Sequence, residues 1–289
     1  MLILLILLFI RTFFSLVTLS LHIVGIYLLS KPNTYQKHQK IYLTNISVLE
    51  ILFLMTSLAQ AYFRYFKCDD CYMYAGIFFL AFIMVSWHNA MIVLTIDRYL
   101  EIRLNIKYEL YISRRLARIL VAFSWSLGGL CFVVSTVVQV FLKKINTCKM
   151  VSTFVLLPYS GILMAVLMFT YWYIYRKMKR CRQIFPQTAN SVEHLRRKKH
   201  QFVPIWIVFT YITCSIIPLI VLHKILSNGT NTRDRNSLLF HIIALLHICC
   251  CFGDVFIYIY LNLSMRRRFI GLFRQKKRVL TLLLMGIFQ

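Results

Sequence analysis

Acidic residues are scarce in this chain of 289 residues, which has nine Asp and Glu against 34 Lys and Arg. Charged residues of both signs make up only 15%, whereas an average soluble domain has about 25%. A soluble fold of this length needs charged side chains on its surface, so the composition excludes an ordinary cytosolic enzyme and a disordered chain. Nine glycines are also too few for a collagen-like fibre.

Hydrophobic residues make up 60% of the chain, and the mean hydropathy is +0.69. A bilayer core roughly 30 Å thick is crossed by about 20 apolar residues in a helix. The runs that are long and apolar enough are Leu2–Ser30, Ile41–Phe63, Tyr72–Ile96, Leu116–Leu142, Val151–Tyr175, Phe202–Leu226 and Leu238–Leu263. These seven runs, joined by short connections, predict an all-α membrane protein with a seven-transmembrane-helix bundle.

The basic residues gather in the segments that follow the first, third, fifth and seventh runs, which together with Arg118 at the start of the fourth run hold 25 of the 34 Lys and Arg. Lys and Arg accumulate in cytoplasmic loops, so the bias places the C-terminus in the cytoplasm and the N-terminus outside. Because topology accounts for the positive charge, we expect no nucleic-acid partner. Arg11 interrupts the first run, and we expect its side chain to snorkel towards the outer headgroups.

The third run ends in Asp97-Arg98-Tyr99. In a chain with seven spans and an outer N-terminus, this placement resembles that of a rhodopsin-like (class A) G-protein-coupled receptor. Other segments resemble the same family over essentially the whole chain. They are Asn45–Glu50 in span two, Trp125 in span four, Tyr171 in span five, Pro218 in span six, Asp254–Tyr258 in span seven, and Met265–Phe269 in the amphipathic helix that follows. The resemblance divides the chain into a receptor domain, residues 1–263, and a short amphipathic cytoplasmic helix with a basic tail, residues 264–289.

The resemblance implies a cell-surface receptor that binds an extracellular ligand and activates a heterotrimeric G protein. Asp97, Arg98 and Tyr99 would form the activation switch, in which Arg98 pairs with a carboxylate and then swings out to the partner. The simpler alternative is that Arg98 only snorkels at the interface. The switch would include other positions of the family pattern: Tyr171, Pro218, Asp254 and Tyr258.

Span six departs from the family where many relatives have a carboxylate that holds the switch arginine. The stretch here reads Arg196-Arg197-Lys198-Lys199, so we expect appreciable signalling without ligand. Ile216 replaces the usual tryptophan of span six, and Val255 replaces the usual proline of span seven. These losses support an alternative, a non-signalling receptor-like scavenger or scaffold. A seven-helix transporter or channel is a further alternative.

Glu50 and Asp254 are the acids that lie well inside spans two and seven. Ionisable groups in hydrocarbon are costly, so both should face the bundle interior. The family places a sodium ion between the matching positions; without a cation, the two carboxyl groups would tend to share a proton. Trp87 stands where the family has a small hydroxyl, and the adjacent Ser86 is the candidate to complete this polar core. Apart from this sodium ion we expect no cofactor.

The resemblance also implies a disulfide on the oxidising outer side, between the start of span three and the loop before span five. Cys71 and Cys148 are the expected pair, with Cys68 as the alternative to Cys71. Cys68 and Cys71 lack a second ligand pair, so we expect no metal site. Asn228, in Asn-Gly-Thr, is a candidate for glycosylation close to the membrane.

The ligand pocket lacks two diagnostic residues. Counting from Arg98, Leu80 stands where amine receptors keep an Asp, and Ile248 stands where opsins keep the Schiff-base Lys. A biogenic amine and retinal are therefore disfavoured, and the ligand class stays open. The basic segments 177–199 and 266–278 would face the G protein and anionic lipid of the inner leaflet. Because no nucleophile–base or metal constellation is evident in the sequence, we expect no enzymatic activity.

Overall fold

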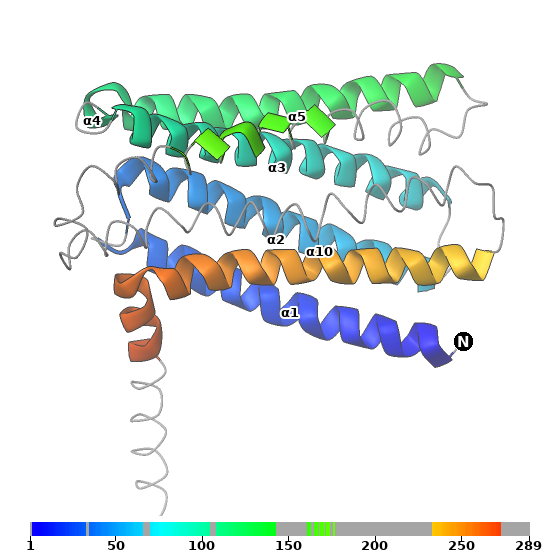
Figure 1. Ribbon diagram of the computed structural model, residues 1–289. Helices are drawn as coiled ribbons and strands as arrows, with labels where there is room; N and C mark the ends of the chain where they lie inside the picture. The colour runs from blue at the N-terminus through cyan, green and yellow to red at the C-terminus, as the bar shows by residue number, and fades with distance from the viewer. Residues whose placement is uncertain are drawn as a thin grey trace, which may run out of the picture.

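The computed structural model describes residues 2–32, 35–65, 70–104, 108–142 and 233–272, with short helical stretches between 161 and 176. Most of these residues lie in long helices that run alongside one another (Figure 1). The long helices are α1 (Leu2–Ser30), α2 (Lys37–Tyr65), α3 (Asp70–Leu104), α5 (Arg114–Leu142) and α10 (Arg233–Leu261). The single turn α4 (Tyr108–Tyr111) lies between α3 and α5.

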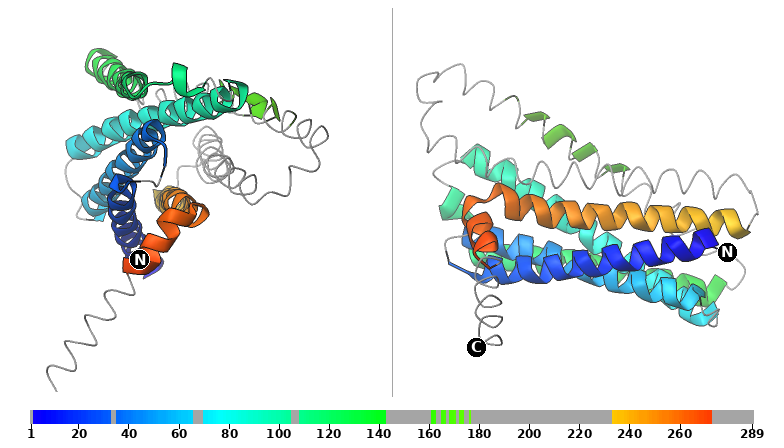
Figure 2. Two further views of the ribbon diagram at one scale, coloured as in Figure 1. Left: turned by 90° about the vertical axis from the view of Figure 1, so that its left-hand side faces the viewer. Right: turned by 90° about the horizontal axis from the view of Figure 1, so that it is seen from below.

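Helix α2 holds the described part of the bundle together, because it contacts α1, α3, α5 and α10. Helix α3 packs against α2 on one side and α5 on the other, and α1 packs against α10 although the two are far apart in the sequence. Figure 2 shows the same arrangement from the end and from below. The arrangement brings α1, α2 and α10 together, and α2 and α10 carry the fully buried acids Glu50 and Asp254.

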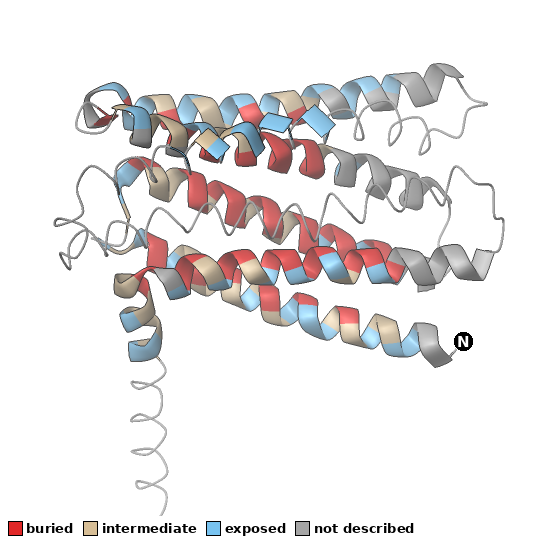
Figure 3. Ribbon diagram, in the orientation of Figure 1, coloured by how far each residue is buried: buried red, intermediate tan, exposed pale blue. Residues whose placement is uncertain are grey.

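Burial of the described residues differs from that in a soluble protein, because many large apolar side chains are exposed and some charged side chains are buried. Figure 3 shows where the buried and exposed residues lie along the helices. Phe9 and Ile23 of α1 and Phe123 of α5 are each more than half exposed, whereas Arg11 and Glu50 are buried. Large exposed apolar faces combined with polar groups between the helices are expected when the surrounding solvent is lipid.

Four of the described helices are long and apolar enough to cross a bilayer, over Leu5–Ser30, Lys37–Tyr62, Arg114–Val134 and His241–Tyr260. The five long helices contain the first four predicted runs and nearly all of the seventh. Helices α2, α3 and α5 extend past their apolar runs because a helix continues into the headgroup region, where polar side chains are tolerated. The predicted runs 151–175 and 202–226 lie outside the described residues, apart from the short stretches named above.

The predicted seventh run passes through Asn262, where the structure ends α10 and begins a new helix over residues 263–272. The Asn262 side-chain oxygen accepts hydrogen bonds from the backbone N–H groups of Ser264 and Met265, at 3.0 and 3.2 Å. This is the N-cap arrangement that starts a helix. Met265 is buried and Phe269 packs against the core, whereas Arg267 is exposed. The new helix therefore has an apolar face and a polar face.

Candidate functional site

The Asp97-Arg98-Tyr99 tripeptide lies near the end of α3, and the Asp97 side chain is buried. Its Oδ1 accepts a hydrogen bond from the hydroxyl of Tyr108 in α4. The same hydroxyl oxygen lies 2.9 Å from Nε2 of His38 on α2. Since a hydroxyl has one proton to donate, His38 must donate the proton of that second bond. These two hydrogen bonds connect α2, α3 and α4 beside the predicted switch. The Arg98 side chain lies outside the described residues.

Tyr99, the last residue of the tripeptide, is half-buried and contacts the described stretch 172–173. Its ring centroid lies 5.1 Å from that of Tyr173, and Arg103 donates a hydrogen bond to its hydroxyl at 3.2 Å. The predicted switch residue Tyr171 lies outside the described residues. Sequence reasoning did not select Tyr173, although the signal, a second tyrosine two positions on, was present.

Glu50 of α2 and Asp254 of α10 are both fully buried and face each other. Their carboxyl groups are close enough to repel each other when both are ionised. Among the described residues, none of the four carboxyl oxygens receives a well-aligned hydrogen bond from another donor. The pair is therefore poised to take up a proton or a cation.

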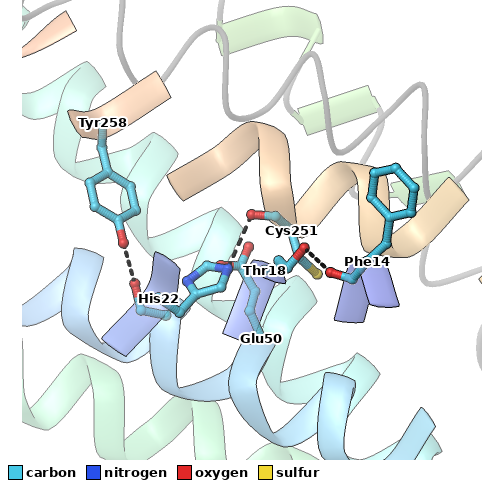
Figure 4. A network of polar contacts seen from close by, with 7 residues as sticks. Phe14, Thr18, His22, Glu50, Cys251 and Tyr258 are labelled. Carbon is cyan, nitrogen blue, oxygen red and sulfur yellow. Dashed lines mark hydrogen bonds and ion pairs between the residues drawn. The ribbon is translucent and has the colours of Figure 1, made fainter. Parts of the chain in front are cut away.

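His22 of α1 is the third member of this polar core, and it was not selected from the sequence. Its Nε2 lies 3.1 Å from the carbonyl oxygen of Cys251 and 3.2 Å from Oε2 of Glu50. Figure 4 shows His22 beside both residues. A carbonyl can only accept, so Nε2 carries a proton and donates it to Cys251. The imidazole thus connects α1 to α10 and lies beside the Glu50 carboxyl group. The available signal was a lone histidine inside an apolar run.

Tyr258 of α10 extends this core towards α1 and α2. Its hydroxyl lies 3.1 Å from that of Ser47, one turn before Glu50 on α2 (Figure 4). The backbone of α1 makes room for it at Gly25, where an added Cβ would lie 2.2 Å from the Tyr258 hydroxyl oxygen. A glycine is required here because of this close approach.

Ser86 of α3, the predicted third member of the polar core with Glu50 and Asp254, faces α5 instead. Its Oγ lies 2.0 Å from where a Cβ on Gly128 of α5 would be, and it has no hydrogen-bond partner among the described residues. Trp87 instead faces α2, with its ring centroid 5.9 Å from that of Phe53. Ser86 thus lies in the contact between α3 and α5, and the structure gives it no bond to the acids.

The donor chemistry at Glu50 and Asp254 fits the sodium ion that the sequence comparison implies. Oxygen ligands are those that hard cations prefer, and four buried carboxyl oxygens have no well-aligned donor in the described part of the chain. A hydroxyl ligand from Ser86 is not supplied, because this side chain faces α5. The imidazole of His22 occupies one side of Glu50.

Arg11 does not snorkel outwards as predicted, because its side chain is only 1% exposed. The guanidinium donates to both the carbonyl oxygen and the hydroxyl of Ser57 on α2, each at 2.6 Å. It also lies 3.4 Å from Nδ1 of His241 on α10. The bonds available inside the bundle compete successfully with the headgroups.

Other predicted residues lie where the structure describes no side chain. Cys71 is on the first turn of α3, but its side chain is outside the described residues. The remaining positions of this kind are Cys68, Cys148, Pro218 and Asn228. The disulfide, the kink in span six and the glycosylation site stay predictions. Two other residues that match the family pattern are in contact in the structure: the indole N–H of Trp125 on α5 donates a hydrogen bond to the side-chain oxygen of Asn45 on α2, at 2.7 Å.

Comparison with known proteins gives one family. The model of the family described as 7 transmembrane receptor (rhodopsin family) matches residues 21–258. The matched range includes Glu50, Asp97, Asp254 and Tyr258, which carry the contacts described above. A comparison with curated proteins finds no match.

Proposed function

Because this chain belongs to the rhodopsin family of seven-transmembrane receptors, we propose that it binds an extracellular ligand and activates a heterotrimeric G protein through Asp97-Arg98-Tyr99. Members of this family are multi-pass membrane receptors rather than enzymes. The observation that carries the proposal is the family match together with a buried Asp97 beside Arg98 at the end of α3.

The contact between Asp97 and Tyr108 supports a switch at this position. Asp97 is the nearest acid to Arg98 in the sequence, and its carboxylate accepts a hydrogen bond from the Tyr108 hydroxyl. We expect the hydrogen bond that Asp97 accepts from Tyr108 to weaken the attraction between Asp97 and Arg98. Release of Arg98 to the G protein then needs less energy than the rupture of a full ion pair in a dry interior.

Ligand binding in the outer halves of spans three, six and seven shifts a two-state equilibrium towards the form with an open cytoplasmic end. Span six swings outward about Pro218, and Arg98 is released. The polar core of Glu50, Asp254 and His22 couples α1, α2 and α10, because a rearrangement of any of these helices must break its contacts.

A sodium ion, when bound, would neutralise part of the negative charge of the two acids. Glu50 and Asp254 would hold it, and His22 limits the space beside Glu50.

The N-terminus lies outside and the C-terminus in the cytoplasm, as the distribution of Lys and Arg indicates. The ligand is neither a biogenic amine nor retinal, since Leu80 and Ile248 replace the residues those ligands need.

A G-protein dissociation assay in intact cells tests the proposal, first without ligand and then against a peptide and lipid library. We expect ligand-independent activity from the wild type and its loss in Arg98→Ala. The matched control is Arg115→Ala, which removes an exposed arginine near the start of α5 and should retain the activity.

Basal activity equal to that of cells with empty vector would contradict the expected ligand-independent signalling. Activity that survives Arg98→Ala would remove the switch role. Ion flux that persists in Arg98→Ala would favour a transporter or channel, and absence of coupling with every ligand would favour a scavenger or scaffold.

A further inference from the structure

Arg11 of α1 is a buried cation that the signalling mechanism does not use. It precedes His22 by eleven residues on the same helix, and a helix rises about 1.5 Å per residue, so the two are about 16 Å apart along the axis. Its contacts, Ser57 of α2 and His241 of α10, lie at the same level. Because α1 begins outside, this level is in the outer half of the bundle, where the ligand is expected to bind.

The groups that Arg11 contacts at this level are neutral. The guanidinium donates to the carbonyl oxygen and the hydroxyl of Ser57. Since a guanidinium can only donate, Nδ1 of His241 is the acceptor of the third contact, and the proton of that ring lies on Nε2. Neutral acceptors satisfy hydrogen bonds, but they do not balance a charge in a dry interior.

The acids of the three helices stand at other levels. Helix α1 has no Asp or Glu. The acid of α2 nearest to Ser57 is Glu50, and the acid of α10 nearest to His241 is Asp234; each is seven residues away. Seven residues of helix rise about 10 Å. The sequences of α1, α2 and α10 therefore place no carboxylate level with the guanidinium.

Gln60 of α2 supplies a neutral donor beside Arg11. It follows Ser57 by one turn on the same face of the helix and is only 6% exposed. Side chains lean towards the N-terminus of their helix, so Arg11 leans outward and Gln60, on the returning helix, leans inward towards it. Among the described residues, Nε2 of Gln60 has no hydrogen-bond partner, and neither has the buried hydroxyl of Ser15, one turn from Arg11. Buried donors of this kind indicate a ligand that brings acceptor oxygens.

We infer that the extracellular ligand carries a carboxylate group, which binds between Arg11 and Gln60. The guanidinium binds the two carboxylate oxygens side by side, and the Gln60 amide donates to one of them. One cation among neutral donors matches the single charge of a carboxylate better than the nearly double charge of a phosphate monoester. The inference rests on the proposed function for the place of the ligand, and it adds the chemistry by which the ligand is recognised.

The test is thermal denaturation of the full-length receptor in detergent with two matched pairs of probes. N-acetyl-phenylalanine and its amide represent the C-terminus of a peptide, and decanoate and decanamide represent a fatty acid. We expect one acid to raise the melting temperature of the wild type and its amide to have no effect, and the acid that acts identifies the source. Arg11→Gln should weaken the binding of that acid about 30-fold or more, as when one member of a buried charge pair is removed. Arg115→Gln is the matched control, because Arg115 is exposed on α5.

Gln60→Leu separates a ligand site from a structural contact. It removes the unpartnered donor and keeps the bonds between Arg11 and Ser57, so the melting temperature without probe should be unchanged or higher. The affinity for the acid should fall about tenfold, the effect of one hydrogen bond to a charged group.

Three outcomes would overturn the inference: equal effects of acid and amide, no effect of either acid on the wild type, or wild-type affinity in Gln60→Leu. Because no G protein is present, a negative result here leaves the signalling assay unaffected. Acid binding by a receptor that fails to couple would instead contradict the proposed signalling alone.

Discussion

His22 of α1 and Glu50 of α2 meet in the fully buried centre of the bundle, with Nε2 and Oε2 3.2 Å apart. The contact adds a third helix to the pair of acids contributed by α2 and α10. Because Nε2 also bonds to Cys251 on α10, one imidazole joins all three helices.

His22→Phe removes the imidazole donor while keeping a ring of similar shape. The change removes the hydrogen bond between α1 and the Cys251 carbonyl, and the loss of a typical hydrogen bond costs about 0.5–1.5 kcal/mol. Thermal denaturation in detergent should therefore show a clear loss of stability. Thr18→Val is the control, because among the described residues the Thr18 hydroxyl bonds within α1, to the carbonyl oxygen of Phe14 at 2.8 Å. Equal stability of the two variants would argue against a joining role for His22.

Gly25→Ala should displace the Tyr258 ring and break its bond to Ser47. The new Cβ would lie 2.2 Å from the Tyr258 hydroxyl oxygen, and overpacking typically costs about 1–3 kcal/mol. In a Tyr258→Phe background the nearest remaining atom would be Cζ, at 3.0 Å, so the cost of Gly25→Ala should fall. A double-mutant cycle on stability measures this difference. An identical cost in both backgrounds would refute the proposed clash.

Two adjacent glycines of α5 should respond in opposite ways to alanine. At Gly128 an added Cβ would meet Ser86 Oγ at 2.0 Å and the backbone oxygen of Phe82 at 2.9 Å, whereas nothing lies within 4 Å at Gly129. Backbone cannot swing aside, so Gly128→Ala should separate α3 from α5 and lower stability. Gly129→Ala should be neutral or stabilising by roughly 0.5–1 kcal/mol, the gain in helix propensity. Matching melting temperatures would show that α3 and α5 are not in close contact here.

Tyr108→Phe should lower ligand-independent signalling. Without the phenol hydroxyl, Asp97 loses a hydrogen-bond donor and its carboxylate attracts Arg98 more strongly. The basal G-protein assay measures the effect, with expression at the cell surface held equal. Tyr111→Phe is the control, because Tyr111 lies in the same short helix and is 64% exposed. An increase in basal activity with Tyr108→Phe would mean that the bond restrains the active form.

The sequence predicted where the described long helices lie along the chain, but it predicted less well which neighbouring helix each side chain faces. Apolar runs predicted the described long helices, and the sparse acids Glu50 and Asp254 had to face inward because hydrocarbon excludes them. Ser86 shows the limit: adjacent helix positions are about 100° apart, and the structure directs Ser86 to α5 and Trp87 to α2. His22 and Gly25 gain their roles from neighbours on α2 and α10, which no pattern within α1 reveals.

The buried guanidinium of Arg11 has a consequence for biosynthesis. Its helix emerges from the ribosome before Ser57 and His241 exist, and an arginine at the centre of an isolated membrane helix costs about 2.5–3.5 kcal/mol at the translocon. The nascent first helix must therefore keep its arginine at the aqueous boundary until later segments arrive. Burial of Arg11 then requires the synthesis of α2, whose Ser57 accepts its two shortest hydrogen bonds.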